Sequence, residues 1–267
     1  MDNFHNSYVI IKVLIGKANY MKLINGDCLE EMKNIPDGSI DMILTDPPYG
    51  TTACKWDSII PFDEMWERLN KLIKPNGAIV LFGSEPFSSA LRMSNIKNYK
   101  YDWKYKKRIA SNFASAKYQP MKHIEDIVVF SRDGKKINYY PIKQQRAESG
   151  KSRINAGFKY NSEGRADFIG GITRNNTDAE YDADLKYPED IQEFNNRAKG
   201  DRGQHPTQKP VALMEYLITT YTNENETILD FTMGSGTTGV ACKNLNRQFI
   251  GIELDEKYYQ VAKERLV

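Results

Sequence analysis

Apolar residues along this chain fall into two patterns. Short apolar runs have the length of buried β-strands, and the segments between them carry apolar residues at every third or fourth position, as one face of a helix does. The runs predict strands near residues 40–45, 78–82, 126–130, 227–230 and 248–252, and the stripes predict helices near 62–73, 86–94, 209–221, 236–245 and 256–265. This alternation predicts an α/β fold with a doubly wound, mostly parallel sheet.

The helix expected over 209–221 illustrates the second pattern. Val211, Met214, Leu217 or Ile218, and Tyr221 recur at helical spacing, so this stripe is expected to be core and not a ligand site. Before it lies a polar segment, where a ligand can meet the free N–H groups of a helix start. The segment reads His205-Pro206-Thr207-Gln208-Lys209-Pro210.

The strand expected near 40–45 runs into Asp46-Pro47-Pro48-Tyr49. Two consecutive prolines fix their own φ angles and restrict the residue before them, so the carbonyl groups of Asp46 and Pro47 are held beside the Asp46 carboxylate. Two acceptors and an aromatic ring suit a flat molecule that carries an NH2 group. A plain turn after a strand is the alternative interpretation of these four residues taken alone.

A glycine-rich turn follows the strand expected near 227–230. Its glycines at 234, 236 and 239 have the spacing Gly-x-Gly-x-x-Gly, and Glu253 ends the next strand nineteen positions after Gly234. Glycines let the backbone approach a ligand closely, and an acid at the end of the next strand accepts hydrogen bonds from ribose hydroxyls. The spacing suits NAD, FAD or S-adenosylmethionine equally. No phosphate-binding Gly-Lys-Ser segment follows, which argues against a nucleotide triphosphatase.

Taken in order, these segments resemble the β-class DNA amino-methyltransferases, which move a methyl group from S-adenosylmethionine to an exocyclic nitrogen of adenine or cytosine. The resemblance spans most of the chain and also includes Gly26-Asp27-Cys28-Leu29, the run from Gly77 to Ser84, and Gly251-Ile252-Glu253. The tetrapeptide precedes the glycine-rich turn, which is the permuted motif order of this class. The resemblance implies a Rossmann-like methyltransferase fold with S-adenosylmethionine as its cofactor.

The resemblance also implies roles for individual residues. The expected catalytic residues are Asp46, Pro47, Pro48 and Tyr49. The expected cofactor-binding residues lie on separate segments of the chain and are Asp27, Cys28, Thr207, Gln208, Lys209, Asp230, Phe231, Gly234, Ser235, Gly236, Thr237, Thr238 and Glu253. Asp27 has a second interpretation of equal weight, as the N-cap of a helix.

One departure from the family pattern concerns Phe231. The glycine loop of this family commonly reads Asp-Pro-Phe-x-Gly-Ser-Gly, whereas here Asp230 is followed directly by Phe231, Thr232 and Met233. The aromatic residue has moved by one position. A cation–π contact between this ring and the sulfonium of the cofactor therefore does not carry over from the family.

The resemblance favours the N6 amine of adenine as the methyl acceptor, because Asp-Pro-Pro-Tyr is the commoner form among adenine enzymes and Ser-Pro-Pro-Tyr or Ser-Pro-Pro-Trp among cytosine-N4 enzymes. Three alternatives stay open: cytosine-N4 transfer, methylation of RNA or of a protein amide, and a DNA-binding module without catalytic activity. The intact tetrapeptide and the complete glycine turn argue against the last. A nicotinamide oxidoreductase would leave the tetrapeptide unexplained.

The composition of the chain mainly excludes certain kinds of site. A chain of 267 residues with 40 % hydrophobic content can build one α/β core and a modest insertion. The three cysteines, Cys28, Cys54 and Cys242, lie far apart, and the chain has only three histidines, so neither a disulfide framework nor a metal site is expected. No cysteine follows a proline as the nucleophile of cytosine-C5 methyltransferases does. We expect the cysteines to be small buried hydrophobes.

Charge is distributed unevenly along the chain. Residues 97–165 hold seventeen bases and six acids, a net charge of +11, which leaves −9 for the rest because the whole chain carries +2. Phosphate contact is the favoured interpretation of this basic segment, with a solvated basic face as the alternative. Aromatic residues interleave with the bases, as expected if some of them stack on or wedge between DNA bases and others belong to the core. The expected DNA contacts are Lys104, Lys106, Lys107, Arg108, Lys117, Lys122, Lys135, Lys136, Arg146, Lys151 and Arg153.

The motifs divide the chain into parts. Residues 1–20 precede the family-like sequence and are an extra strand, a disordered lead or an upstream start choice. The catalytic half is expected over 21–134, a small inserted target-recognition region with long loops over 135–204, and the cofactor-binding half over 205–267. Double-stranded DNA is the expected partner, a cognate restriction endonuclease is a further candidate, and a monomer and a homodimer both stay open.

The N-terminus lacks the pattern of a signal peptide, and no stretch of the sequence could span a bilayer. A cytoplasmic enzyme encoded by a prokaryote or a phage is therefore expected, without a membrane partner.

Overall fold

The computed structural model of the protein describes residues 8–13, 19–51, 57–148, 184–196 and 208–266. The chain forms two compact units. One consists of Met1–Tyr140 together with Asp190–Val267, and the other of Pro141–Glu189.

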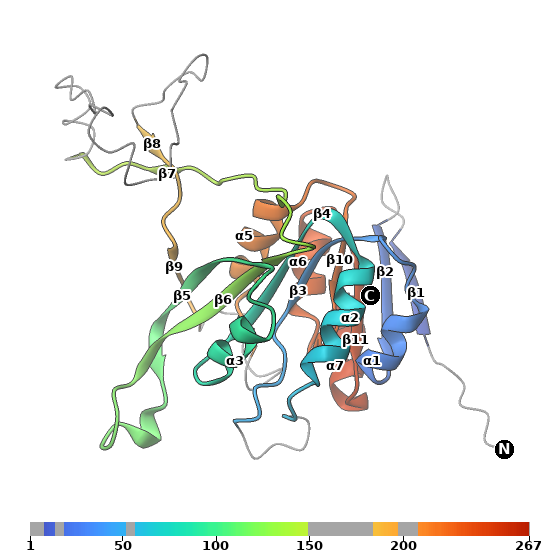
Figure 1. Ribbon diagram of the computed structural model, residues 1–267, viewed down its shortest axis with the longest axis horizontal. Coiled ribbons are helices and arrows are strands. Elements are labelled where there is room, and N and C mark those ends of the chain that lie inside the picture. The colour runs from blue at the N-terminus through green and yellow to red at the C-terminus, as the bar shows by residue number, and fades with distance from the viewer. Residues whose placement is uncertain (1–7, 14–18, 52–56, 149–183, 197–207, 267) are drawn as a thin grey trace. The chain divides into compact units, whose positions relative to one another are not determined.

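The larger unit is built on a sheet whose described strands follow the order β1-β2-β11-β10-β3-β4-β6-β5-β9 (Figure 1). Five of them, from β2 to β4 in this order, are parallel. β1 pairs antiparallel with β2 at one edge, and β6 and β5 add antiparallel strands beyond β4. The bounds are β1 Tyr8–Val13, β2 Asn19–Asn25, β3 Ile40–Thr45, β4 Ile73–Gly83, β5 Tyr99–Ser111, β6 Lys122–Ser131, β9 Ile191–Phe194, β10 Thr227–Asp230 and β11 Gln248–Glu253.

Helices cover both faces of this sheet. Because neighbouring residues of a strand point to opposite faces, residues such as Met42 and Leu44 of β3 pack on one side and Ile43 on the other. The first core packs against α5 Val211–Tyr221, α6 Thr237–Asn244 and α7 Glu256–Leu266. The second packs against α1 Cys28–Glu31, η1 Met32–Asn34, α2 Phe62–Leu72 and α3 Phe87–Ser94. The expected α/β fold with a mostly parallel, doubly wound sheet is confirmed.

The direction of winding reverses between β3 and β10. From β3 the chain passes through α2 to β4 on one side, and from β10 it passes through α6 to β11 on the other. The two strands are parallel neighbours, with Met42 opposite Ile228 and Ile43 opposite Leu229. Ligands of doubly wound sheets bind beyond the carboxyl ends of the strands at such a reversal.

The apolar stripe expected on the helix over 209–221 lies on α5. Met214, Leu217, Ile218 and Tyr221 are buried in the first core, and Val211 packs against its margin. This prediction is confirmed.

Several strands were not predicted from apolar runs. In β5, buried Trp103 and Tyr105 alternate with Lys104 and Lys106, so its apolar face consists of aromatic residues set between bases. β1 shows that residues 1–20 contribute an extra strand, one of the three interpretations left open. β9 pairs parallel with β5 although about eighty residues of sequence separate them.

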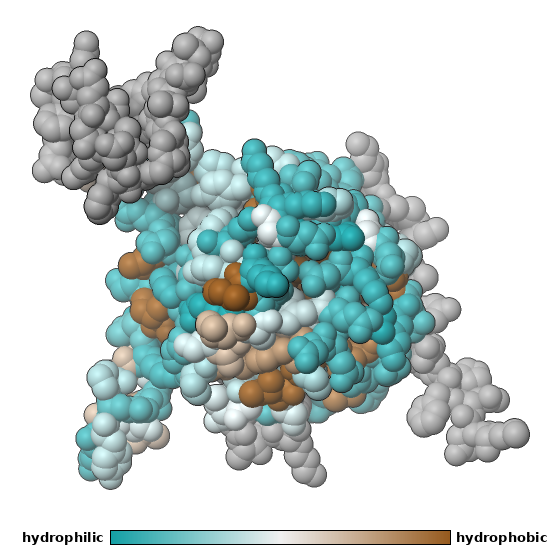
Figure 2. Space-filling view, viewed as in Figure 1, coloured by the Kyte–Doolittle hydropathy of each residue, from teal (hydrophilic) through white to brown (hydrophobic). Residues whose placement is uncertain are grey.

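The connection from β5 to β6 contains η2 Phe113–Ser115 and carries exposed aromatic rings. Phe113 is 82 % and Tyr118 is 89 % exposed. Hydrophobic residues otherwise form small separate patches on the largely hydrophilic face drawn in Figure 2.

The smaller unit contains a short antiparallel pair, β7 Gln144–Gln145 and β8 Leu185–Lys186. The Arg146 guanidinium donates to the Leu185 carbonyl oxygen at 2.9 Å, which ties the two strands together. Among the described residues of the whole chain, no helix has the length and apolar character needed to cross a bilayer.

Candidate active site

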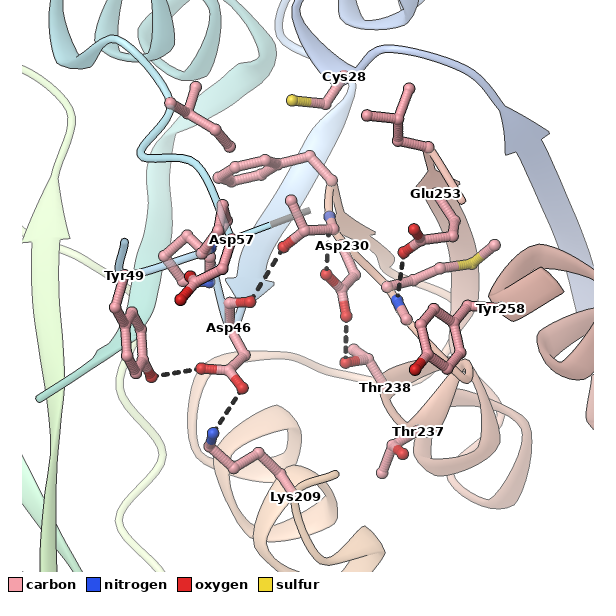
Figure 3. A pocket seen from close by; sticks show the side chains of 18 of the residues that line it. Cys28, Asp46, Tyr49, Asp57, Lys209, Asp230, Thr237, Thr238, Glu253 and Tyr258 are labelled. Carbon is pink, nitrogen blue, oxygen red and sulfur yellow. Dashed lines mark hydrogen bonds and ion pairs between the residues drawn. The ribbon is translucent and has the colours of Figure 1, made fainter. Parts of the chain in front are cut away.

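Asp46 begins the turn that leaves β3, a strand in which every residue is buried. One carboxylate oxygen of Asp46, Oδ1, accepts a hydrogen bond from the Tyr49 hydroxyl. The other, Oδ2, accepts from the Lys209 ammonium group at 2.5 Å (Figure 3). The Asp46 side chain keeps 22 % of its surface exposed, whereas Lys209 keeps 7 %. Asp46 therefore meets the solvent side of the site, with its cationic partner behind it.

Tyr49 is held from two sides. Its ring stacks on Phe87 with 5.0 Å between ring centres, and its hydroxyl faces Asp46. Burial, followed by the nearby Asp46 carboxylate, raises the pKa of the Tyr49 hydroxyl. This hydroxyl therefore remains protonated and serves as a donor.

A hydroxyl group joins β3 to β10 directly behind the tetrapeptide. Thr45 Oγ1 donates to Asp230 Oδ1 at 2.9 Å and accepts from the Phe231 N–H at 3.1 Å. The Thr232 hydroxyl donates to the Asp46 carbonyl oxygen at 3.2 Å. These bonds fix the position of the tetrapeptide relative to the glycine loop.

Asp230 is buried beneath that loop. Its Oδ1 also accepts from the Thr232 N–H, and its Oδ2 accepts from the Thr238 hydroxyl at 2.5 Å. Burial raises the pKa of Asp230 to about 7, although the hydrogen bonds from Thr238, Thr45 and Thr232 act in the opposite direction. The carboxyl group is therefore partly protonated near neutral pH.

The glycine loop turns between β10 and α6. Gly234 and Gly236 have φ angles of 53° and 78°, in the left-handed region that glycine adopts without strain. Arg265, at the end of α7, donates to the Ser235 carbonyl oxygen at 2.7 Å. Thr237 and Thr238 begin α6 and are buried.

Glu253, the last residue of β11, faces the same loop. Its Oε2 accepts from the Gly234 N–H and its Oε1 from the Asp255 N–H, both at 2.8 Å. Burial raises the pKa of Glu253, while these backbone donors act to lower it.

A single cavity of about 660 Å³ runs from the tetrapeptide to the glycine loop. All four expected catalytic residues line it, and so do eleven of the thirteen expected cofactor residues. Those eleven are Asp27, Cys28, Gln208, Lys209, Asp230, Phe231, Gly234, Ser235, Thr237, Thr238 and Glu253. Gly236 is not part of the lining, and Thr207 lies outside the described residues.

Asp27 and Cys28 lie where α1 begins. The Asp27 carboxylate accepts from the Leu29 N–H at 2.9 Å and from the Glu30 N–H at 3.2 Å, so Asp27 is a helix N-cap and also faces the cavity. Burial raises the pKa of the Cys28 thiol to about 12. Cys242 is fully buried, and Cys54 lies outside the described residues.

Phe231 and Gln208 both line the cavity. The Phe231 side chain is 1 % exposed and belongs to the second core. Gln208 Oε1 accepts from the Ser235 hydroxyl at 3.3 Å, and its Nε2 is buried without a hydrogen-bond partner among the described residues. An unpaired buried donor at the cavity wall suits an acceptor on a bound molecule.

The bases expected to contact DNA lie in different surroundings. Lys104 pairs with Asp102 and Asp126, Lys106 with Glu193, and Lys107 with Glu125. Lys107 is also buried and lines the cavity. Lys106 is nevertheless exposed, as are Arg108, Lys117, Lys122, Lys135 and Lys136. Arg146 belongs to the smaller unit, and Lys151 and Arg153 lie outside the described residues.

Four residues of this site were not found from the sequence. Asp57 accepts from the N–H groups of Gly50 and Thr51, both at 2.9 Å, and so closes the turn after Tyr49. Glu125 lies 3.4 Å from the Lys209 ammonium group. Thr232 lies inside the glycine loop, Arg265 at the end of an expected helix, and Glu125 directly before an expected strand. No pattern in the sequence gave any of the four a role in the site.

Comparisons with known proteins agree on one family. A family model described as DNA methylase, for N6 and N4 methyltransferases, matches residues 40–264. The Type II methyltransferase M.HpaI of Haemophilus parainfluenzae is 30 % identical, with 92 % of this chain and 74 % of that protein covered. The Type II methyltransferase M2.DpnII of Streptococcus pneumoniae is 28 % identical, with 98 % and 97 % covered.

Solved structures give the same result. M1.HpyAVI, crystallised as a complex with S-adenosylmethionine, matches with a TM-score of 0.62 and 27 % identity over 92 % of this chain and 98 % of its own. The cytosine-N4-specific PvuII DNA methyltransferase matches with a TM-score of 0.64 and 16 % identity over 92 % and 86 %, a likeness of fold.

The fold and the shared cavity therefore define a Rossmann-like methyltransferase that depends on S-adenosylmethionine. Since the family model spans most of the chain, the chain belongs to the DNA methylase family of N6 and N4 amino-methyltransferases.

The cavity wall fits this cofactor. Gly234 and Gly236 let the loop backbone approach a ligand closely, and Glu253 ends the adjacent strand as ribose-binding acids do. The unpaired Gln208 Nε2 offers a donor to a carboxylate. When bound, the cofactor supplies a methyl group attached to a positively charged sulfonium sulfur. Loss of the methyl group leaves this sulfur as a neutral thioether.

The raised pKa of Asp230 predicts how the stability of the cofactor-free protein varies with pH. A carboxyl group whose folded pKa of about 7 exceeds its ordinary value stabilises the fold at low pH, and this contribution disappears as pH rises toward 7. The free energy of unfolding relative to the Asp230→Asn variant should therefore fall by about 3 kcal/mol between about pH 5 and pH 8. Urea unfolding of both proteins at each pH measures the difference. A difference that does not change with pH would contradict the assignment.

Proposed function

We propose that this enzyme transfers the methyl group of S-adenosylmethionine to the N6 amine of an adenine flipped out of double-stranded DNA. The observation that carries the proposal is that the Asp46 carboxylate opens onto the same cavity as the glycine loop. An aspartate at the first position of the tetrapeptide favours adenine over cytosine, whose N4 enzymes commonly begin with serine.

The chain's own groups act on the target amine. The lone pair of an exocyclic amine is delocalised into the ring, so the nitrogen is a poor nucleophile. Asp46 and the Pro47 carbonyl oxygen accept its two hydrogens, which favours a pyramidal nitrogen and stabilises the positive charge that develops on it. The N–C bond forms as the C–S bond breaks, the electron pair goes to sulfur, and the nitrogen then releases one proton toward Asp46.

The target nitrogen is inaccessible in a duplex, so the base must leave the stack at a cost of a few kcal/mol. Stacking on the Tyr49 ring returns about 1–3 kcal/mol of that cost. The ring is already held in place by Phe87 and Asp46.

The basic segment supports DNA as the partner. Arg108, Lys117 and Lys122 are exposed on β5, after η2 and at the start of β6, in the same part of the chain as the exposed rings of Phe113 and Tyr118. Cations beside exposed rings suit phosphates and unstacked bases. We further propose that residues 135–204 read the target sequence, with residues 21–134 and 205–267 forming the two halves of the catalytic domain.

The product nucleoside tests the proposed function. Unmethylated duplex DNA is incubated with the protein and S-adenosylmethionine, digested to nucleosides and examined by mass spectrometry. We expect N6-methyladenine, and no product from Asp46→Ala although this variant still binds the cofactor. N4-methylcytosine would establish cytosine as the target. An active Asp46→Ala enzyme would contradict the mechanism.

Two substitutions of Tyr49 separate its ring from its hydroxyl. Tyr49→Ala removes the stacking surface, so it should raise KM for DNA and lower kcat, with kcat/KM falling about 10-fold or more. Tyr49→Phe keeps the ring and removes only the hydrogen bond to Asp46, so its kcat/KM should fall much less. Steady-state kinetics on a duplex substrate measure both, and an equal decrease in the two variants would show that the ring does not hold the base.

Removing two exposed bases of the basic segment should weaken DNA binding in a salt-dependent way. In Arg108→Ala/Lys117→Ala, the slope of log affinity against log salt should become shallower by about 0.9 for each phosphate that the protein no longer neutralises. The control Lys33→Ala/Lys71→Ala removes two charges from η1 and α2 and should leave the slope unchanged. Fluorescence anisotropy at several salt concentrations measures both, and equal slopes would exclude phosphate binding by Arg108 and Lys117.

A further inference from the structure

A row of alternating charges leads from Asp46 into the protein. The Lys209 ammonium group lies 2.5 Å from Asp46 Oδ2 and 3.4 Å from Glu125 Oε2. The second Glu125 oxygen, Oε1, accepts from the Lys107 ammonium group at 2.9 Å. The order is thus Asp46, Lys209, Glu125 and Lys107, and each inner charge lies between two opposite ones.

Separate elements contribute these four residues. Asp46 follows β3, Lys209 precedes α5, Glu125 is on β6 and Lys107 is on β5. All four line the cavity, although Lys209 and Lys107 are 7 % exposed. The Lys209 ammonium group also lies 5.1 Å from the centre of the Phe82 ring, which closes one side of it.

A row of this kind is weakly explained by stability alone. Withdrawing an ion from water costs several kcal/mol where it is buried, as Lys209 and Lys107 are, before attraction to its partners returns that cost. Apolar side chains of similar size often stabilise a core as well. Removing a single member of the row is strongly destabilising, because it leaves the neighbouring charge without its partner. The row ends on the carboxylate that meets the target amine, which points to a role in the reaction.

The two partners of Asp46 are anchored differently. The Tyr49 hydroxyl on Oδ1 belongs to a ring that also serves the incoming base, so this bond can be exchanged for one from the amine. Lys209 on Oδ2 is held by a second carboxylate, Glu125, which keeps it in place during that exchange. One carboxylate oxygen is then available to the amine while the other stays bound.

We propose that Lys209, held by Glu125, is a positioning residue that orients the Asp46 carboxylate toward the target amine. This inference rests on the proposed function. It differs from the role that the family resemblance implies for Lys209, which is to bind the cofactor. The described partners of its ammonium group are the carboxylates of Asp46 and Glu125.

The ionisation of the row agrees with this arrangement. Burial alone would lower the pKa of Lys209, but Asp46 and then Glu125 outweigh it and hold the pKa above its ordinary value. Burial alone would raise the pKa of Glu125, but Lys209 and Lys107 outweigh it and hold the pKa below its ordinary value. Lys209 therefore stays an ammonium ion across the pH range of ordinary assays.

Further titratable groups face this row. They are the Tyr49 hydroxyl on Asp46, Asp126 on β6 near Tyr49, and the buried Asp230 beneath Asp46. Of these, Asp126 is paired with Lys104, and Tyr49 remains protonated. Replacing Glu125 removes one of the two carboxylates that hold Lys209 and leaves the Asp46 side chain itself unchanged.

Glu125→Gln provides the test. With one of its two carboxylates removed, Lys209 should release its proton at lower pH, so the single-turnover rate constant on a DNA duplex should fall at least about fivefold between about pH 8 and pH 10. The wild-type rate constant should not fall over this range. Adding Lys209→Arg to Glu125→Gln should remove the fall, because a guanidinium keeps its proton. A rate that falls equally with and without Lys209→Arg would overturn the proposal.

Two measurements on a double variant distinguish a positioning role of Lys209 from misfolding and from a role in cofactor binding. The double variant Lys209→Met/Glu125→Gln removes one charge of each sign, so the buried net charge is unchanged. Its kcat should fall about 100-fold, as when an oriented donor is removed from an active site. Its Kd for S-adenosylmethionine by calorimetry should stay within about twofold of wild type, because a positioning role gives neither side chain a part in cofactor binding. Wild-type turnover, or a defect confined to cofactor affinity, would overturn the proposal.

The carbon-13 shift of Lys209 Cε reports its protonation without turnover. We expect wild-type Lys209 to stay charged up to about pH 10 and to titrate in Glu125→Gln at the pH where its rate constant falls. A wild-type protein that transfers no methyl group to DNA would refute the proposed function, and the titration would still test the row. Wild-type deprotonation below about pH 9 would then overturn it.

Discussion

The hydroxyl of Thr45 links the two motifs on which the site depends. It donates to the Asp230 carboxylate and accepts from the Phe231 N–H, so the last residue of β3 is bonded to the start of the glycine loop. The two strands already lie side by side in parallel register. These buried hydrogen bonds and the pairing of the two strands thereby fix the distance between the tetrapeptide and the cofactor-binding loop. When a group is transferred between two bound ligands, the protein has to control this distance.

This arrangement also explains why the order of motifs along the chain matters little. β3 and β10 are adjacent although more than 180 residues of sequence lie between them. The tetrapeptide and the glycine loop meet because parallel strands end at the same edge of a sheet, whichever strand comes first. The permuted order changes where the chain is cut and leaves the contacts at the reversal of winding intact.

Much of the fold could be predicted because its central strands are apolar runs. β3, β10 and the glycine turn have patterns that depend on neighbouring residues in the sequence, and the residues of the cavity lie at their ends. β5 could not be found in this way, since its buried face consists of Trp103 and Tyr105 between lysines. The pairing of β9 with β5 is a contact between distant parts of the sequence that no local pattern reports. Glu125 and Arg265 were missed for the same reason, because their partners Lys209 and Ser235 are distant in the sequence.

For the basic segment, the net charge counted from the sequence overstates the number of cations available at the surface. The sum of +11 over residues 97–165 treats every lysine as a surface cation, yet Lys104, Lys106 and Lys107 are each paired with an acid. Glu193, the partner of Lys106, lies outside the segment, so the local field is weaker than the sum indicates. Lys107 has left the surface altogether and belongs to the row of charges behind Asp46. The same stretch of sequence therefore contributes cations of two kinds. The exposed ones can exchange water for phosphate at little cost, whereas the buried ones are useful only because carboxylates hold their charge in place.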